Sequence, residues 1–322
     1  MNGSCMRLVA ALGLALFLHA GAQAQAYPNK PIKLILPNTT GSPVDALARV
    51  VAQHMQPRLG QSVLIDNRPG GAMTIGTKAV ASADPDGYTL LLSNNGLFFG
   101  LTPNAGYDPL KSFTPVAMLA EWNHVLVVRP AYPAKSVREL IDYARANPGK
   151  TTFGFGAATT PQILGETLKN ATGVDIASVP YRGGAQAVTD MMGGRIDMNF
   201  GTTATLLPLI QQQKVRALAY TGTKRTPDLP DLPTMIESGF PQLAFNPDVW
   251  TAISAPAGTP AAIVNRLHVA VNEALAAPEL KASFAKFGFD IVTKPFAELD
   301  AFMAAEALKW PPVVKAAGLK PE

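Results

Sequence analysis

One loop near the start of the chain combines residue types that suit the binding of a small anion. It reads Pro37-Asn38-Thr39-Thr40-Gly41-Ser42 and follows an apolar run over residues 32–36. A helical pattern begins after it, with Val44, Leu47 and Val51 on one face. Unpaired N–H groups of such a loop and the positive end of the helix dipole both favour an anion. The loop holds no acid, thiol or histidine, so it predicts ligand binding without catalysis.

The second half of the chain repeats this arrangement. A strand pattern over residues 152–154 leads into Gly156-Ala157-Ala158-Thr159-Thr160, and a helix pattern starts at Pro161, a residue preorganised for a first helical turn. Glycine pairs precede two further helix patterns, at Gly70-Gly71 and Gly183-Gly184. In an open α/β sheet such loops lie at the carboxyl ends of the strands, where ligands bind. Two lobes that face each other through these loops would enclose an anion between helix N-termini.

Paired threonines occur in both loops, and their hydroxyl groups are able to donate to a carboxylate. They are Thr39 and Thr40 in the first loop and Thr159 and Thr160 in the second. Threonine also caps helices, which is the simpler interpretation for either loop alone. The recurrence in both halves favours a ligand role.

Tyr181 and Arg182 precede the second glycine pair and offer two further contacts. A tyrosine ring supplies an apolar wall with a hydroxyl group. An arginine can bind a carboxylate through two parallel hydrogen bonds. Each has an alternative, because Tyr181 also fits the core at a strand end and Arg182 also fits solvent.

Catalytic and metal-binding patterns find little support in the sequence. His54, His124 and His268 follow the first 26 residues, and no HExxH or paired spacing joins them. No Gly-x-Ser-x-Gly elbow is present. Residues 154–156 begin like a dinucleotide fingerprint, but Thr159 stands where the third glycine belongs. We therefore predict no catalytic residue, no metal site and no cofactor.

The first 26 residues are typical of a secretory signal peptide. Arg7 precedes an apolar stretch over residues 8–18, and cleavage fits after Ala24 or, preferably, after Ala26. No apolar segment reaches the ~20 residues that span a bilayer, so a soluble mature chain is expected. The single cysteine, Cys5, lies before the apolar stretch, which leaves the mature chain without thiols or disulfides. These features are compatible with a bacterial periplasm.

Charge gives no sign of a nucleic-acid partner. The whole chain has 27 basic and 23 acidic residues, and only Arg7 of these lies in the predicted signal peptide. The charges are scattered, and no basic run or basic helix face stands out. The mild positive balance is compatible with anionic ligands, although solubility alone explains it equally well.

Strand and helix patterns alternate from residue 32 to residue 200, the order of a parallel sheet with helices on both faces. Strands are predicted over residues 33–36, 63–66, 89–93, 125–128, 152–154, 176–179, 198–200 and 217–221. Helices are predicted over residues 43–56, 74–83, 137–147, 161–171, 185–192, 205–213, 260–276 and 278–287. A last helix, 295–316, should break near Pro311-Pro312, because proline cannot continue the helical hydrogen bonds.

Several motifs in a fixed order carry a family resemblance from Tyr27 nearly to the end of the chain. They are Tyr27-Pro28, Asp66-Asn67-Arg68-Pro69-Gly70-Gly71, Pro85-Asp86-Gly87-Tyr88-Thr89-Leu90, Val179-Pro180-Tyr181-Arg182-Gly183-Gly184, Gly193-Gly194-Arg195-Ile196-Asp197 and Ala255-Pro256-Ala257-Gly258-Thr259-Pro260. With them the chain resembles the periplasmic substrate-binding proteins of tripartite tricarboxylate transporters, the Bug-type receptors.

The resemblance implies an α/β, two-lobed type II periplasmic-binding-protein fold, in which each lobe is a mainly parallel sheet flanked by helices. Lobe 1 would hold residues 27–124 and 253–322, and lobe 2 residues 125–252. Two crossing strands near residues 125–128 and 250–254 would form the hinge. The lobes would close on a small carboxylate, partly through ordered waters, and deliver it to a membrane permease. A monomer is expected.

The resemblance also places the ligand site. The residues carried over to it are Asn38, Thr39, Thr40, Gly41, Ser42, Asn94, Asn95, Gly156, Ala157, Ala158, Thr159, Thr160, Tyr181, Gly183, Gly184, Gly201 and Thr202. Citrate-like, aliphatic dicarboxylate and aromatic carboxylate ligands all fit such a site.

Two departures from the family pattern bear on the ligand. The first loop has Asn38-Thr39-Thr40 where FPPGG is common, and Phe200-Gly201-Thr202 stands where many members read Phe-Asp-Asn. A buried ammonium without a counter-charge is costly, so we hypothesise a carboxylate without an amino group. A periplasmic sensor subunit would share this fold and stays open as an alternative. A secreted α/β enzyme is a third alternative, but the sequence shows no nucleophile–base pair for it.

Overall fold

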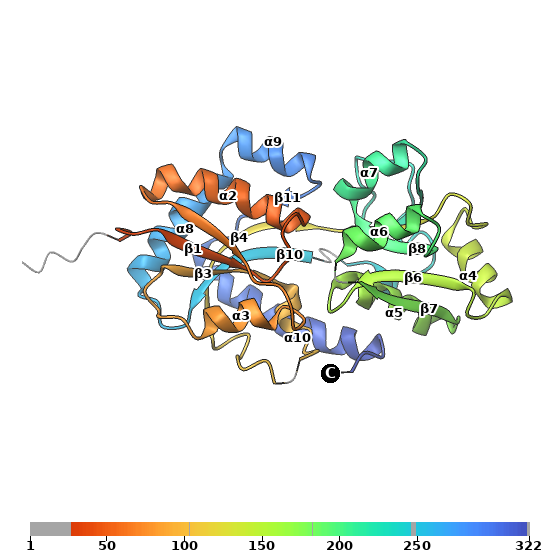
Figure 1. Ribbon diagram of the computed structural model, residues 1–322, viewed down its shortest axis with the longest axis horizontal. Coiled ribbons are helices and arrows are strands. Elements are labelled where there is room, and N and C mark those ends of the chain that lie inside the picture. Colours follow the sequence, from red (N-terminus) through yellow and green to blue (C-terminus); the bar gives the residue numbers. More distant parts are fainter. Residues whose placement is uncertain (1–26, 103, 182, 246–248, 321–322) are drawn as a thin grey trace, which may run out of the picture.

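The computed structural model describes residues 27–102, 104–181, 183–245 and 249–320, which form two α/β lobes side by side (Figure 1). The predicted signal peptide with its cleavage site, Arg182 and Asn246 lie outside these residues. Each lobe is built on one mixed sheet with helices packed against it. No helix in the described ranges is both long enough and apolar enough to cross a membrane.

Six strands form the sheet of the first lobe, in the order β11-β4-β10-β3-β1-β2. Their bounds are β1 (Ile32–Leu36), β2 (Val63–Asn67), β3 (Thr89–Asn94), β4 (Phe113–Trp122), β10 (Val249–Pro256) and β11 (Asp290–Ile291). β1 is parallel to β2 and β3, whereas β10 is antiparallel to both of its neighbours, β3 and β4. The apolar run that opens the chain is therefore an interior strand, which explains why Leu34 and Leu36 are fully buried.

Helices cover this sheet and connect its strands. They are α2 (Pro43–Leu59), α3 (Thr74–Ala81), η1 (Asn95–Phe98), α8 (Ala261–Leu275), α9 (Pro278–Lys286), η3 (Phe296–Glu298) and α10 (Leu299–Ala316). α2 and α8 share one core with the sheet, in which Leu47, Met55 and Leu267 are fully buried. The predicted Ser42–Pro43 start of α2 is present, since Ser42 caps the helix and Pro43 takes its first position.

The predicted break at Pro311-Pro312 is wrong, because α10 continues through both prolines. Pro312 has no N–H for the carbonyl group of Leu308. Leu308 is 79% exposed, so water can satisfy its carbonyl group. Trp310 and Val314 are buried on the opposite face and hold the helix in place.

Five strands form the second sheet, in the order β7-β6-β8-β5-β9. The elements of this lobe are β5 (His124–Val128), β6 (Thr151–Gly156), β7 (Ile176–Tyr181), β8 (Met198–Thr202), β9 (Arg216–Tyr220), α4 (Val137–Ala146), α5 (Thr160–Thr172), α6 (Gly184–Met192), α7 (Thr203–Gln211) and η2 (Pro241–Leu243). β6 is parallel to β7 and β8, and β5 is antiparallel to β8 and β9. In each sheet most strands run in one direction; β10 and the short edge strand β11 run the other way in the first sheet, and β5 does so in the second.

The chain crosses between the lobes at the ends of β4 and β10. Asn123 alone separates β4 from β5, and its side-chain amide donates to the carbonyl of Phe245 at 2.8 Å. β10 starts at Val249, opposite Trp122. The segments predicted to lie near the crossings, residues 125–128 and 250–254, follow these points directly, inside β5 and β10. The predicted lobe boundary at residue 253 falls within β10.

Candidate functional site

The first predicted loop connects β1 to α2 and is organised by the carboxylate of Asp45, in the first turn of α2. The backbone N–H of Gly41 donates to Asp45 Oδ2 at 3.0 Å, and Asp45 N donates to the Ser42 hydroxyl. Arg49 and Asn67 also donate to Asp45, which is buried. Burial raises the pKa of Asp45, but these hydrogen bonds outweigh it and hold the pKa below its usual value. The Ser-x-x-Asp spacing of Ser42 and Asp45 is the sequence signal for this arrangement at a helix start.

Polar groups of Asn38, Thr39 and Thr40 remain open in this loop. Both threonines are exposed, and within the described residues neither their hydroxyl nor their backbone N–H groups make a hydrogen bond. The side-chain oxygen of Asn38 is buried without a partner in the same part of the structure. The loop therefore offers several donors and one acceptor to a bound molecule.

The matching loop of the second lobe connects β6 to α5. The Thr159 hydroxyl donates to the carbonyl of Gly156 at 2.6 Å, and Ala158 N donates to Gln162 Oε1 at 2.7 Å. Ala158 has a φ of +54°, which fits the sharp turn. The hydroxyl of Thr159 thus holds its own loop together. The loop passes close to α6, since a Cβ at Gly156 would lie 3.7 Å from Gly184 N.

Near these loops the two lobes meet at two places, which we name the open end and the closed end. At the open end, a Cβ on Gly183 would lie 3.7 Å from the Thr39 hydroxyl. At the closed end, the Asn95 side-chain amide donates to the Thr160 hydroxyl at 3.0 Å, and both residues are buried. In Figure 1 the start of α2 faces the start of α6 across the junction of the lobes.

Two of the helices that start at this junction have no side-chain cap. Thr159 precedes α5 and Gly183 precedes α6, and neither provides a capping hydrogen bond. In α5, however, Pro161 has no N–H and Gln162 N donates to the carbonyl of Thr159 at 3.1 Å, so it is the start of α6 whose first N–H groups need acceptors from elsewhere. A carboxylate between the lobes would supply them and would also meet the positive ends of the helix dipoles.

Tyr181 reaches a different partner from the one expected. Its hydroxyl donates to Asp190 Oδ2 at 2.9 Å, and its ring packs in the cluster that includes Ile196. Burial and the bond to Asp190 raise the pKa of Tyr181, whereas the bonds from Arg195 and Tyr181 lower the pKa of Asp190. The hydroxyl is engaged within the second lobe, so the core interpretation explains Tyr181 best.

Three more predicted residues have local structural roles. Asn94 accepts a hydrogen bond from Gly96 N at 2.8 Å and so caps η1. Thr202 caps α7 by accepting from Thr205 N at 3.3 Å. At Gly201 a Cβ would lie 2.8 Å from the Leu206 side chain, so close packing against α7 requires glycine there.

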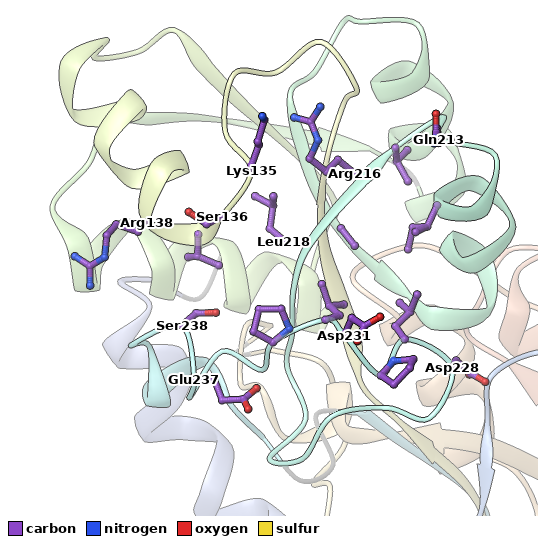
Figure 2. A pocket seen from close by; sticks show the side chains of 18 of the residues that line it. Lys135, Ser136, Arg138, Gln213, Arg216, Leu218, Asp228, Asp231, Glu237 and Ser238 are labelled. Atoms are coloured by element: carbon purple, nitrogen blue, oxygen red, sulfur yellow. The ribbon is translucent and has the colours of Figure 1, made fainter.

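A groove of about 1130 Å³ lies elsewhere in the second lobe (Figure 2). Lys135 and Arg138 line one part of it, and Asp228 and Asp231 another. β9 begins beside it, opposite Val128, the last residue of β5. Because β5 runs against β8, the groove lies at the amino ends of the parallel strands, away from the loops. None of the predicted ligand residues that the structure describes lines it.

Two of the three histidines that follow residue 26 contact backbone carbonyl groups within the fold. His54 contacts the carbonyl of Val50 at 2.9 Å, and His268 contacts that of Val116 at 2.7 Å. Over the described ranges no group of three or more His, Cys, Asp or Glu side chains could hold a metal ion.

The sequence also matches a known protein family and its members. Residues 47–319 match the family described as "Tripartite tricarboxylate transporter family receptor". BugT of Bordetella pertussis is 35% identical, over 98% of this chain and 98% of that protein.

Two solved structures are similar over nearly the whole fold. The periplasmic binding protein BugD is 32% identical with a TM-score of 0.84, over 92% of this chain and 100% of that one. Rpa4515 of R. palustris with adipate is 33% identical with a TM-score of 0.85, over the same shares of the two chains, 92% and 100%. The chain therefore belongs to the tripartite tricarboxylate transporter receptors, a family of periplasmic solute-binding receptors and not of enzymes.

Proposed function

We propose that this protein captures a small aliphatic dicarboxylate between its lobes in the periplasm and delivers it to the permease of a tripartite transporter. One observation carries the proposal: the uncapped start of α6 lies beside the first loop, whose Thr39 and Thr40 have open donors. Two sets of N–H and O–H donors on opposite lobes suit a ligand with a carboxylate at each end.

In this proposal the first lobe contributes residues 38–40, and the second contributes the backbone N–H groups at the start of α6. We take the lobes as residues 27–122 with 249–320, and residues 124–245, from the ends of β4, β5 and β10. Secretion would remove the first 26 residues. Asn38, with its unpartnered side-chain oxygen, would accept from a ligand hydroxyl group or a bridging water.

The charges of the site favour a ligand without an amino group. Asp45 is the carboxylate nearest the first loop, and Gly41, Arg49 and Asn67 already donate to it. A ligand ammonium would compete for an acceptor that is fully engaged, and leaving it unpaired in a closed site is costly. The adipate bound to Rpa4515, a relative with 33% identity, is a dicarboxylate of the proposed class.

Calorimetry on the purified mature protein tests this function. Adipate and succinate should bind, and aspartate should bind at least about tenfold more weakly, which is 1.4 kcal/mol. The double variant Thr39→Val with Thr40→Val should weaken diacid binding about tenfold or more, because it removes two hydroxyl donors. Thr223→Val, at an exposed turn of the second lobe, is the matched control and should bind as the unmodified protein does. Tight binding of aspartate without binding of adipate or succinate would contradict the proposal.

A further inference from the structure

The closed end differs from an ordinary ligand contact because two predicted ligand residues bind each other across the lobes. Asn95 begins η1 in the first lobe and Thr160 begins α5 in the second. The two residues are 2% and 3% exposed, and the amide–hydroxyl distance is 3.0 Å. A buried polar pair of this kind resists separation, since each partner loses a hydrogen bond when it is exposed alone.

An apolar contact lies directly behind this pair. Ile163, one turn along α5, is fully buried in one cluster with Phe98 and Trp310 of the first lobe. Asn170, further along α5, donates to the carbonyl of Ala316 at the end of α10. The two lobes are therefore joined along α5 at this end.

We propose that Asn95 and Thr160 are a positioning pair that forms the end wall of the cleft and limits the length of the diacid it accepts. This inference rests on the proposed function. A ligand held by Thr39 and Thr40 and by the start of α6 extends toward the start of α5, where the pair closes the space. Loss of the hydrogen bond between them lets the two side chains part and opens this wall, so longer diacids should gain relative to shorter ones.

The test measures calorimetric dissociation constants for succinate, adipate and suberate, which have four, six and eight carbons. Asn95→Ala and Thr160→Val should each shift the suberate-to-succinate preference about tenfold toward suberate, the scale on which pockets discriminate methylene groups. The double variant should shift it no further than either single change, because both remove the same wall. Thr160→Ser keeps the hydroxyl group and should keep the original preference.

The outcomes separate the two claims. Equal weakening of all three diacids would show a merely structural pair and overturn the inference while leaving the function intact. Additive effects of the two substitutions would also overturn it, because they would indicate two independent ligand contacts. If the unmodified protein binds none of the diacids, the proposed function and this inference both fail. Circular dichroism melting of each variant confirms that it is folded before binding is measured.

Discussion

The open end and the closed end join the same two lobes with opposite chemistry. At the open end an exposed threonine, Thr39, approaches a glycine, Gly183, across 3.7 Å, measured to the Cβ that this glycine lacks. At the closed end a buried hydrogen bond is backed by fully buried Ile163 and Trp310. Separating the second pair of surfaces exposes apolar area and unpairs polar groups, whereas separating the first exposes very little.

This difference indicates at which end the lobes can separate with little loss of free energy. The lobes should part at the open end and remain joined along α5, so the polar loop around Thr39 moves relative to α6. Ligand engagement would then close a cleft that is already shut at one end. Four substitutions probe the contrast, in decreasing order of expected effect.

Trp310→Ala should break the closed end most severely. The indole is fully buried, stacks on Phe245 with ring centres 5.7 Å apart and contacts Phe99 edge to face. Removing a buried aromatic ring typically costs about 3–5 kcal/mol, which urea unfolding would measure. Leu308→Ala, on the exposed face of the same helix, is the control and should change stability by no more than about 0.5 kcal/mol. A loss below about 1 kcal/mol for Trp310→Ala would remove the basis for a rigid closed end.

Glu306→Leu should also weaken the closed end, through hydrogen bonds. Glu306 is buried and its Oε2 accepts from the indole N–H groups of Trp250 and Trp310, both at 2.6 Å. Leucine would leave two buried donors unpaired, at a cost of about 2–4 kcal/mol in the free energy of unfolding. Glu306→Gln keeps an acceptor oxygen and should lose less. Equal losses for both variants would mean that the charge, and not the hydrogen bonds, matters.

Asp45→Asn should change how the open end responds to acid. Because the pKa of Asp45 is lowered in the fold, its ionised form stabilises the folded state above the ordinary aspartate pKa of about 3.9. This contribution is lost as the pH falls through the lowered pKa. Unfolding free energies measured from pH 7 down to pH 3 should therefore fall less steeply at the acid end for the variant, with a difference of about 1–2 kcal/mol at neutral pH. Parallel curves at all pH values would show that Asp45 contributes nothing through its charge.

Gly183→Ala should have the smallest effect and thereby sharpen the comparison. Gly183 has an extended backbone with φ of −168°, so alanine fits without strain, and its Cβ would make an ordinary contact with Thr39. Stability should change by no more than about 0.5 kcal/mol and the diacid Kd by less than about threefold. A large loss of stability would mean that the open end is as tightly packed as the closed end.

Sequence reasoning recovered elements whose signals are local. The apolar run of β1 and the Ser42–Pro43 start of α2 mark their own boundaries. β4 was missed because eight of its ten residues are buried on both faces, which removes the alternation that marks a strand. The strand β10 was interpreted only as a crossing for the same reason, since all its residues are buried.

The site was harder to predict because its partners are distant in sequence. Asn95 and Thr160 were each expected to contact a ligand, but only the folded chain shows that they bind each other, 65 positions apart. The bond from Tyr181 to Asp190 joins β7 to α6 and was likewise invisible as a pattern. Local residue types indicate which loops could bind a ligand. Which side chains of these loops bind each other depends on how distant segments pack in the folded chain.

The positions of the tryptophans have a spectroscopic consequence. The chain has three, Trp122, Trp250 and Trp310. Trp122 ends β4 where the chain crosses, and Trp250 and Trp310 share Glu306 beside Phe245. All indole emission of the protein therefore originates at the junction of the lobes. Domain rotation during ligand capture can be followed by the intrinsic fluorescence of the unlabelled protein, in real time.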